Sequence, residues 1–133
     1  MNQRIRYRTR VVIAWLIPTV LLIAVVALQT ILGHFGGRNS DAWNWVCTTA
    51  LPMCGIVFAL AIPTNDISWR KFLLALGASI AYWIMVWATI LLSPFAPVNI
   101  ADLMIISNFW LSPMQCIVGA CLGFAFSPQE NNP

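Results

Sequence analysis

Charged residues are scarce in this sequence: Asp, Glu, Lys and Arg make up 8% of its 133 residues, whereas hydrophobic residues make up 60%. A soluble domain carries roughly 25% charged residues, because it needs a polar shell in contact with water. Seven basic and four acidic side chains cannot form such a shell. The composition therefore excludes an ordinary soluble protein and predicts surroundings of lipid or of other protein.

Side chains that support catalysis or bind metals are scarce as well. The sequence has one histidine, His34, whereas metal and haem sites usually need several ligands. No apolar run contains an acid that could act as a base beside a nucleophile, so we expect no enzyme, no bound metal and no cofactor. Proton-coupled transporters and voltage sensors also place an ionisable group inside the bundle. Asp102, the one acid beside an apolar run, is interpreted as a helix cap.

The sequence also lacks a C-x-x-C pair, the arrangement that many thiol-redox proteins use. Its four cysteines lie seven residues apart in one apolar run and five apart in another: Cys47 and Cys54, then Cys116 and Cys121. A buried cysteine usually serves as a small apolar residue, and we interpret these four in that way. A transporter or a thiol-redox membrane protein is therefore only our third hypothesis.

What the sequence does contain is four apolar runs of the length that crosses a bilayer, which is about 20 residues. These runs are continuously apolar and do not alternate with period two, so they predict helices and not a barrel. The first run is longer than the ~7–15-residue apolar core of a signal peptide, and we expect it to be retained. The predicted fold is an all-α integral membrane protein, a single domain of four transmembrane helices with short loops, at about 11–32, 43–62, 71–92 and 103–126.

The positive charges predict the orientation of these helices. Six of the seven lie in the amino tail 1–10 or in the second loop: Arg4, Arg6, Arg8, Arg10, Arg70 and Lys71. By the positive-inside rule this side is the cytoplasm, and it also holds the polar tail 127–133. We expect these residues to contact anionic lipid headgroups and not nucleic acid. The interface aromatics should be Trp15 and Trp69 on the inner side, and Trp43, Trp45 and Trp110 on the outer side.

The short loops and the absence of an N-glycosylation sequon fit a bacterial inner membrane. Small residues at a spacing of four recur in three of the predicted helices, where they allow close helix contacts. The pairs are Gly55 and Ala59, Gly77 and Ala81, and Gly119 and Gly123. They fit either packing within one chain or an oligomer contact along the fourth helix.

Prolines and neutral polar residues also occur inside the predicted spans. Pro18, Pro52 and Pro113 each remove a backbone donor and predict a kink; at Pro52 the freed carbonyl belongs to Thr48. Kinked packing is the first interpretation of these prolines, and a gating hinge is the alternative. A polar face is expected on the fourth helix, opposite two hydroxyls of the second: Asn108, Ser112 and Gln115, with Thr48 and Thr49. This face fits either hydrogen bonds between helices or the uncharged polar lining of a path for ions or water at the centre of an oligomer.

Two functional hypotheses of different classes follow. The leading one is a non-enzymatic subunit or self-assembling component of a membrane complex, whose partners are the bilayer and either copies of itself or a larger membrane-protein complex. The small-residue pairs and the lack of buried charge favour it. The alternative is an oligomeric channel or pore-forming effector in which the fourth helix lines the path.

Overall fold

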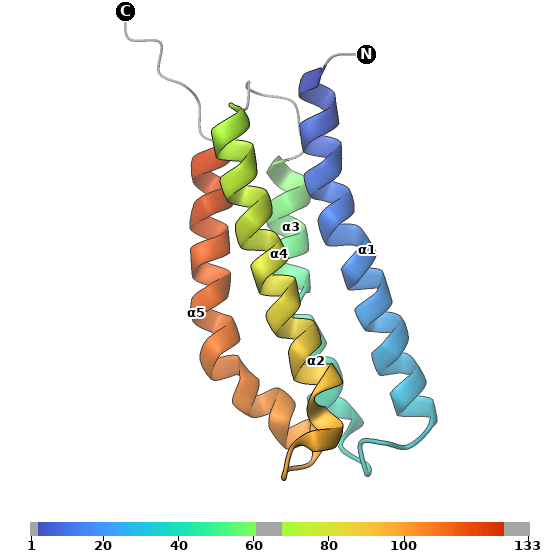
Figure 1. Cartoon of the computed structure of the whole chain (residues 1–133). Coiled ribbons are helices and arrows are strands. Elements are labelled where there is room, and N and C mark those ends of the chain that lie inside the picture. The colour runs from blue at the N-terminus through green and yellow to red at the C-terminus, as the bar shows by residue number, and fades with distance from the viewer. Residues whose placement is uncertain (1–2, 61–67, 127–133) are drawn as a thin grey trace, which may run out of the picture.

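The computed structural model describes the backbone of residues 3–60 and 68–126, and the side chains of residues 9–57 and 68–126. Helices are the only regular secondary structure in this part of the chain, which confirms the all-helical prediction. The elements are α1 (Gln3–Ile31), α2 (Asn39–Thr49), α3 (Leu51–Leu60), α4 (Trp69–Leu91), the 3-10 turn η1 (Ser93–Phe95) and α5 (Ile100–Phe126). They form an up-and-down bundle in which the start of α1 and the end of α5 lie at the same end (Figure 1).

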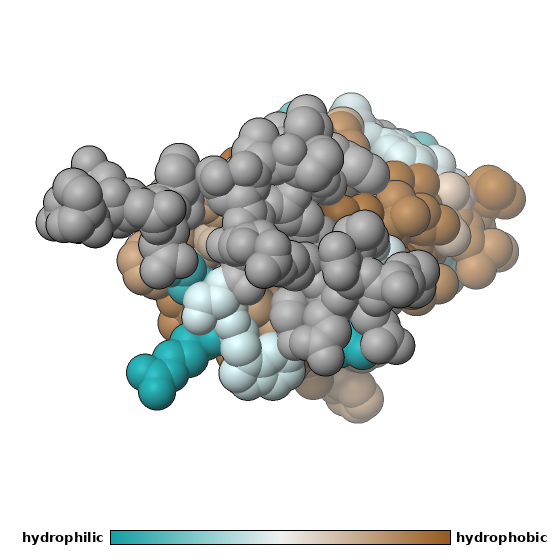
Figure 2. Space-filling model, turned by 90° about the horizontal axis from the view of Figure 1, so that it is seen from above, coloured by the Kyte–Doolittle hydropathy of each residue, from teal (hydrophilic) through white to brown (hydrophobic). Residues whose placement is uncertain are grey.

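Three of the helices contain segments long and apolar enough to cross a membrane: Thr9–Ile31, Trp69–Leu91 and Ile100–Phe126. Within their most apolar windows only 22–39% of the residues are buried, so large hydrophobic side chains cover much of the bundle surface. Seen from the end that carries the termini, hydrophobic residues form part of the outer surface of the bundle, mainly on one side (Figure 2). Such a surface suits hydrocarbon and not water.

The second predicted span requires a correction, because it is not one continuous helix. It is divided at Ala50 into α2 and α3, and α2 begins at Asn39, four residues before the predicted start at Trp43. Residues 61 and 62 of that span lie outside the described part of the chain. Because α2 and α3 follow one another alongside the other helices (Figure 1), the arrangement is compatible with a four-helix bundle.

The other boundaries differ from the prediction by smaller amounts. The first helix begins at Gln3, so the basic tail continues the helix and is not a separate segment. The fourth predicted span begins earlier, at Ile100, because the Asn99 side chain accepts a hydrogen bond from the Ala101 N–H at 3.0 Å and caps α5. The prediction that Asp102 is the cap is therefore wrong.

Two of the three predicted kinks do not interrupt their helices. Pro18 lies inside α1 and Pro113 inside α5, and both helices continue through them. Figure 1 shows α5 curved along its length, whereas the only interrupted span in the described part is the one that contains Pro52. The chain turns between α1 and α2, and the positive φ angles of Gly33, Gly36 and Gly37 (71°, 56° and 88°) explain the glycines there.

Buried tryptophans hold the helices together through hydrogen bonds to serines. Trp15 of α1 donates its Nε1–H to Ser79 Oγ of α4 at 3.0 Å, and Trp45 of α2 donates to Ser107 Oγ of α5 at 2.8 Å. Trp15 also stacks on Tyr82 with 5.7 Å between the ring centroids. Both indoles are almost fully buried inside the bundle, where they contact other helices. The apolar part of each ring fills the core, and the serine satisfies its one donor.

Replacing Ser107 by alanine should destabilise the bundle. The variant leaves the Trp45 N–H buried without its acceptor, and the free energy of unfolding should fall by about 1–2 kcal/mol, as measured by denaturant titration in detergent micelles. Ser112→Ala is the matched control, because Ser112 lies on the same helix but is exposed. Equal losses in the two variants would contradict the role given to the Trp45–Ser107 hydrogen bond.

Candidate functional site

The break between α2 and α3 follows from the chemistry of Pro52. Proline has no N–H, so the carbonyl of Thr48, four residues earlier, has no helical donor. Pro52 lies in the first turn of α3, where a helix needs no N–H from it. Helical hydrogen bonds resume on both sides, from Ala50 N to Val46 O at 2.9 Å and from Cys54 N to Ala50 O at 3.1 Å. The interruption is therefore confined to about one turn.

Side chains from two other helices satisfy the carbonyls at this break. The Gln115 Nε2 group of α5 donates to Thr48 O at 3.0 Å and to Thr49 O at 2.7 Å. The Tyr82 hydroxyl of α4 donates to Thr49 O at 2.8 Å and lies 2.9 Å from Gln115 Nε2 as its acceptor. We call these four residues the break cluster. It joins α2, α4 and α5 by uncharged hydrogen bonds.

The break cluster contains three of the five residues predicted for the polar face. Thr48, Thr49 and Gln115 do meet, but through backbone carbonyls and not through the threonine hydroxyls. The Thr48 hydroxyl bonds inside α2, at 3.0 Å from Asn44 O and 3.1 Å from Trp45 O. The Thr49 hydroxyl oxygen is buried and has no hydrogen-bond partner among the described residues.

The other two predicted polar residues do not belong to the break cluster. Asn108 is half-buried and Ser112 is exposed, so the polar face divides between the interior and the surface of the bundle. Tyr82 is the fourth member of the cluster. From the sequence it is expected to add a hydroxyl from the third predicted span, and a buried Tyr hydroxyl needs a partner.

The predicted small-residue pairs are not places of close approach within the chain. A Cβ atom added at any of Gly55, Gly77, Gly119 or Gly123 would have no neighbouring atom within 4 Å. Gly119 is half-buried, and the other three glycines and Ala81 are exposed. The side chain of Ala59 lies outside the described residues. The structure therefore does not support packing within one chain as the role of the four glycines.

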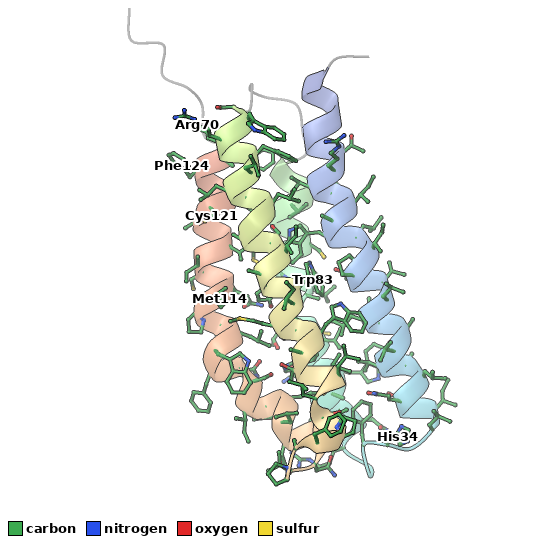
Figure 3. All side chains as sticks on the ribbon, viewed as in Figure 1. His34, Arg70, Trp83, Met114, Cys121 and Phe124 are labelled. Carbon is green, nitrogen blue, oxygen red and sulfur yellow. The ribbon has the colours of Figure 1, made fainter. Side chains whose placement is uncertain are left out.

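The basic residues lie at the end that carries the termini. Figure 3 shows Arg70 at this end, close to Phe124, and His34 at the opposite end. Lys71 Nζ lies 4.8 Å from the centroid of the Phe124 ring, a cation–π contact between α4 and α5. Arg10 is exposed, whereas the side chains of Arg4, Arg6 and Arg8 lie outside the described residues.

The opposite end carries an ion-pair network. Arg38, in the turn after α1, bonds to Asp102 of α5 and to Asp41 of α2, the latter at 2.8 Å. These two hydrogen bonds, with that to Asp102 the larger cause, raise the pKa of Arg38 above its ordinary value. Arg38 therefore stays charged and is neutralised by two acids.

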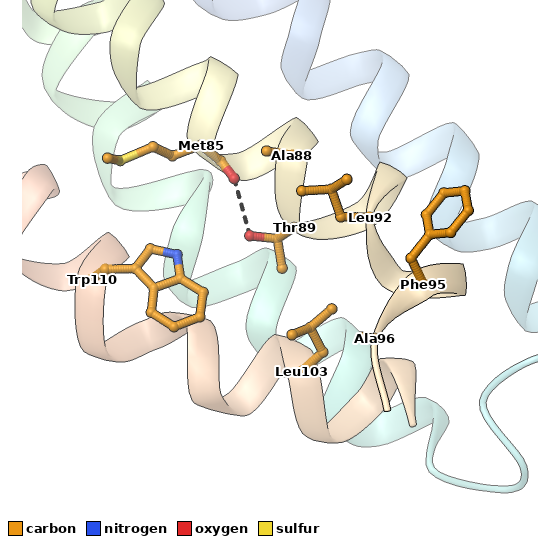
Figure 4. Close-up of a pocket in the computed structure, with 8 residues that line it drawn as sticks. All are labelled: Met85, Ala88, Thr89, Leu92, Phe95, Ala96, Leu103 and Trp110. Atoms are coloured by element: carbon orange, nitrogen blue, oxygen red, sulfur yellow. Dashed lines mark hydrogen bonds between the residues drawn. The ribbon is translucent and has the colours of Figure 1, made fainter. Parts of the chain in front are cut away.

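An apolar groove of about 460 Å³ lies between α4, η1 and α5 (Figure 4). Thr89 supplies its one hydroxyl, and that hydroxyl already donates to Met85 O at 3.0 Å. The rest of the lining is hydrophobic: Met85, Ala88, Leu92, Phe95, Ala96, Leu103 and Trp110. The groove thus offers shape and apolar surface but no reactive group.

The remaining candidate side chains are dispersed. His34 is exposed, and in the described part of the chain no three His, Cys, Asp or Glu side chains are grouped closely enough to hold a metal ion. All four cysteines are free thiols, and Cys54 Sγ lies 3.2 Å from Thr19 Oγ1 of α1. Comparison of the chain with protein-family models, curated proteins and solved structures found no match.

The two donors of the break cluster should act together. Gln115→Leu and Tyr82→Phe should each lower the free energy of unfolding by about 1–2 kcal/mol, because each removes a hydrogen-bond donor from a backbone carbonyl at the break. In the double variant, the loss of unfolding free energy should differ by about 0.5 kcal/mol or more from the sum of the two single losses. The reason is that the two side chains share Thr49 O and contact each other. Strict additivity in a denaturant titration would show that they act independently.

Proposed function

We propose that this chain is a non-enzymatic integral membrane protein that associates with copies of itself as a component of a membrane complex. The observation that supports this proposal is a row of small residues along the outside of α5. Ser112, Cys116 and Gly123 are exposed and Gly119 is half-buried, with spacings of four, three and four residues. Such spacings keep all four on one face of a helix.

A row of this kind is suited to helix–helix contact in a bilayer. Lipid tails are as apolar as leucine, so helices associate where small side chains let their backbones come close. Among the described residues, no atom lies within 4 Å of a Cβ added at Gly119 or Gly123. Phe109 precedes the row and is 82% exposed, which leaves a large aromatic side chain free to pack against a second helix. A second copy of α5 fits these features.

The pore hypothesis receives less support from the geometry. In the pore hypothesis, Gln115 lines the path. The amide nitrogen of Gln115, however, already donates hydrogen bonds to two carbonyls and to the Tyr82 hydroxyl. Ser112 and the half-buried Asn108 are the polar side chains of α5 that an oligomer could still place beside a path. Self-association is therefore the function that we put forward.

We further propose that the protein lies in a bacterial inner membrane with both termini in the cytoplasm. The start of α4, with Arg70 and Lys71, lies at the end that carries the termini (Figures 1 and 3), whereas Arg38 lies in the turn after α1 at the other end. An excess of Lys and Arg in short segments marks the cytoplasmic side.

Reporter fusions should test this orientation. A reporter inserted after Gly37 should be active only as a periplasmic enzyme, and one inserted after Asn65 only as a cytoplasmic enzyme, because one span separates the two sites. Asn65 lies outside the described residues, so this position tests the topology independently of the structure. The reverse pattern, or the same compartment for both sites, would exclude the proposed orientation.

Self-association should depend on the outer face of α5. In fluorescence resonance energy transfer between labelled copies in liposomes, Gly119→Leu and Gly123→Leu should each weaken association roughly tenfold, because the added side chain holds two backbones apart. Neither change should affect unfolding of the single chain, since the space beside both glycines is empty.

The matched control is Gly77→Leu, which places the same side chain in equally empty space on α4. It should leave the energy transfer unchanged. A monomeric parent protein, or an equal loss of transfer in all three variants, would contradict association through α5.

A further inference from the structure

Two polar side chains near the middle of α5 have no partner within the described part of the chain. Asn108 is half-buried and Ser112 is exposed, and neither side chain makes a hydrogen bond to another described residue. Their neighbours on the same helix differ, because the Ser107 hydroxyl donates to Met104 O at 2.7 Å and Gln115 donates to α2. α5 therefore presents an amide and a hydroxyl that its own bundle leaves unsatisfied.

A backbone carbonyl beside them also lacks its helical donor. Pro113 has no N–H, so the carbonyl of Phe109, four residues earlier, cannot form the usual helical hydrogen bond. At Pro52 the corresponding carbonyl, that of Thr48, accepts a hydrogen bond from the Gln115 amide. No side chain among the described residues donates to Phe109 O. The requirement that the break cluster meets at Pro52 is thus left open at Pro113.

These groups lie at a depth where water could not replace the missing partners if α5 spans a bilayer. Pro113 is the central residue of the 27-residue helix Ile100–Phe126. Asn108 lies about 7.5 Å along the helix from it, whereas the hydrocarbon core extends about 15 Å to either side of its middle. Unpaired polar groups in hydrocarbon are strongly destabilising. In a bilayer, these groups therefore need donors and acceptors from another helix.

A second copy of α5 supplies the matching chemistry. Asn108 precedes Ser112 by four residues, so it extends the row of small residues on the same face of the helix. Copies inserted in one orientation pack in parallel about a twofold axis, where equivalent residues meet at equal depth. An amide has donors and an acceptor, so two Asn108 side chains can bond to each other. Helical carbonyls point toward the following turn, so the Phe109 carbonyl points to the level of Ser112.

We propose that Asn108 and Ser112 fix the register in which two copies of α5 pack together. The Asn108 amides of the two copies bond to each other, and the Ser112 hydroxyl of each copy donates to the Phe109 carbonyl of the other. This pairing rests on the proposed self-association through α5 and adds to it the polar contacts that select one alignment. A single Asn in the contact between two helices specifies register in coiled coils in the same way.

Energy transfer between labelled copies of the full chain in liposomes tests the Asn108 contact. Asn108→Leu should weaken association roughly three- to tenfold, the effect of losing hydrogen bonds between helices. Asn44→Leu is the matched control, because Asn44 is also exposed to the outside of the bundle but lies on α2. It should leave the transfer unchanged. Equal association of the parent and the Asn108→Leu chain would overturn the proposal.

Pro113→Ala tests the part played by the Phe109 carbonyl. Alanine restores an N–H that bonds to this carbonyl within its own helix, so the second copy is no longer needed as a donor. Association should fall by roughly threefold or more. Pro18→Ala makes the same change inside α1, which also continues through its proline, and should have no effect. No loss in Pro113→Ala, or an equal loss in both variants, would contradict the proposed pairing.

Disulfide cross-linking at Cys116 measures the register directly. Cys116 is exposed and follows Ser112 by four residues, so parallel copies in the proposed alignment bring their two Cys116 thiols together. With the other three cysteines replaced by alanine, oxidation by copper phenanthroline in liposomes should join the copies into a dimer on a non-reducing gel. A chain that keeps only Cys47, which is also exposed but lies on α2, should remain monomeric on the gel.

The outcomes separate this pairing from self-association itself. If Gly119→Leu weakens association but Asn108→Leu does not, or if associated copies fail to cross-link through Cys116, the copies meet in another alignment and the proposed register is wrong. A parent chain that shows no energy transfer would instead contradict self-association, and the register with it.

Discussion

The missing N–H of Pro52 is the constraint on which the arrangement of the bundle depends. A carbonyl without a donor costs several kcal/mol in hydrocarbon, where no water can replace the lost hydrogen bond. The chain meets this requirement by bringing Gln115 and Tyr82 to the carbonyls of Thr48 and Thr49. The same demand accounts for the pairing of Trp45 with Ser107. Helices that share little polar surface are thus oriented by a few neutral hydrogen bonds.

The sequence was sufficient to predict the helical fold, because apolar runs of this length and so few charges leave little choice. The prolines predicted a kink in each of three spans, and nothing in the sequence distinguished the span of Pro52, which is the divided one in the described part of the chain. Gln115 was expected to face Thr48 and Thr49, but its bonds to their backbone carbonyls, and that of Tyr82, depend on the packing of distant helices. The cap of α5 was missed for a related reason: Asp102 is bonded to Arg38, which lies 64 residues earlier.

Two polar residues of α5, Gln115 and Ser112, have different surroundings, although helical spacing places them close together. Gln115 contributes to the interior, whereas Ser112, three residues earlier, is exposed. A pattern with helical spacing predicts which residues share a side of a helix, but not where the boundary between interior and surface falls. Glycine patterns have the same ambiguity, because close packing and empty space are both compatible with Gly119 and Gly123.

The position of the two chain ends has a consequence for how copies can be linked. The first turns of α1 and the last turns of α5 lie at one end of the bundle (Figure 1). A flexible Gly/Ser linker that joins the carboxyl end of one copy to the amino end of the next could therefore stay at that end of the bundle. Two or more units could be joined in tandem without an additional helix between them, which would give assemblies of fixed stoichiometry in a single polypeptide.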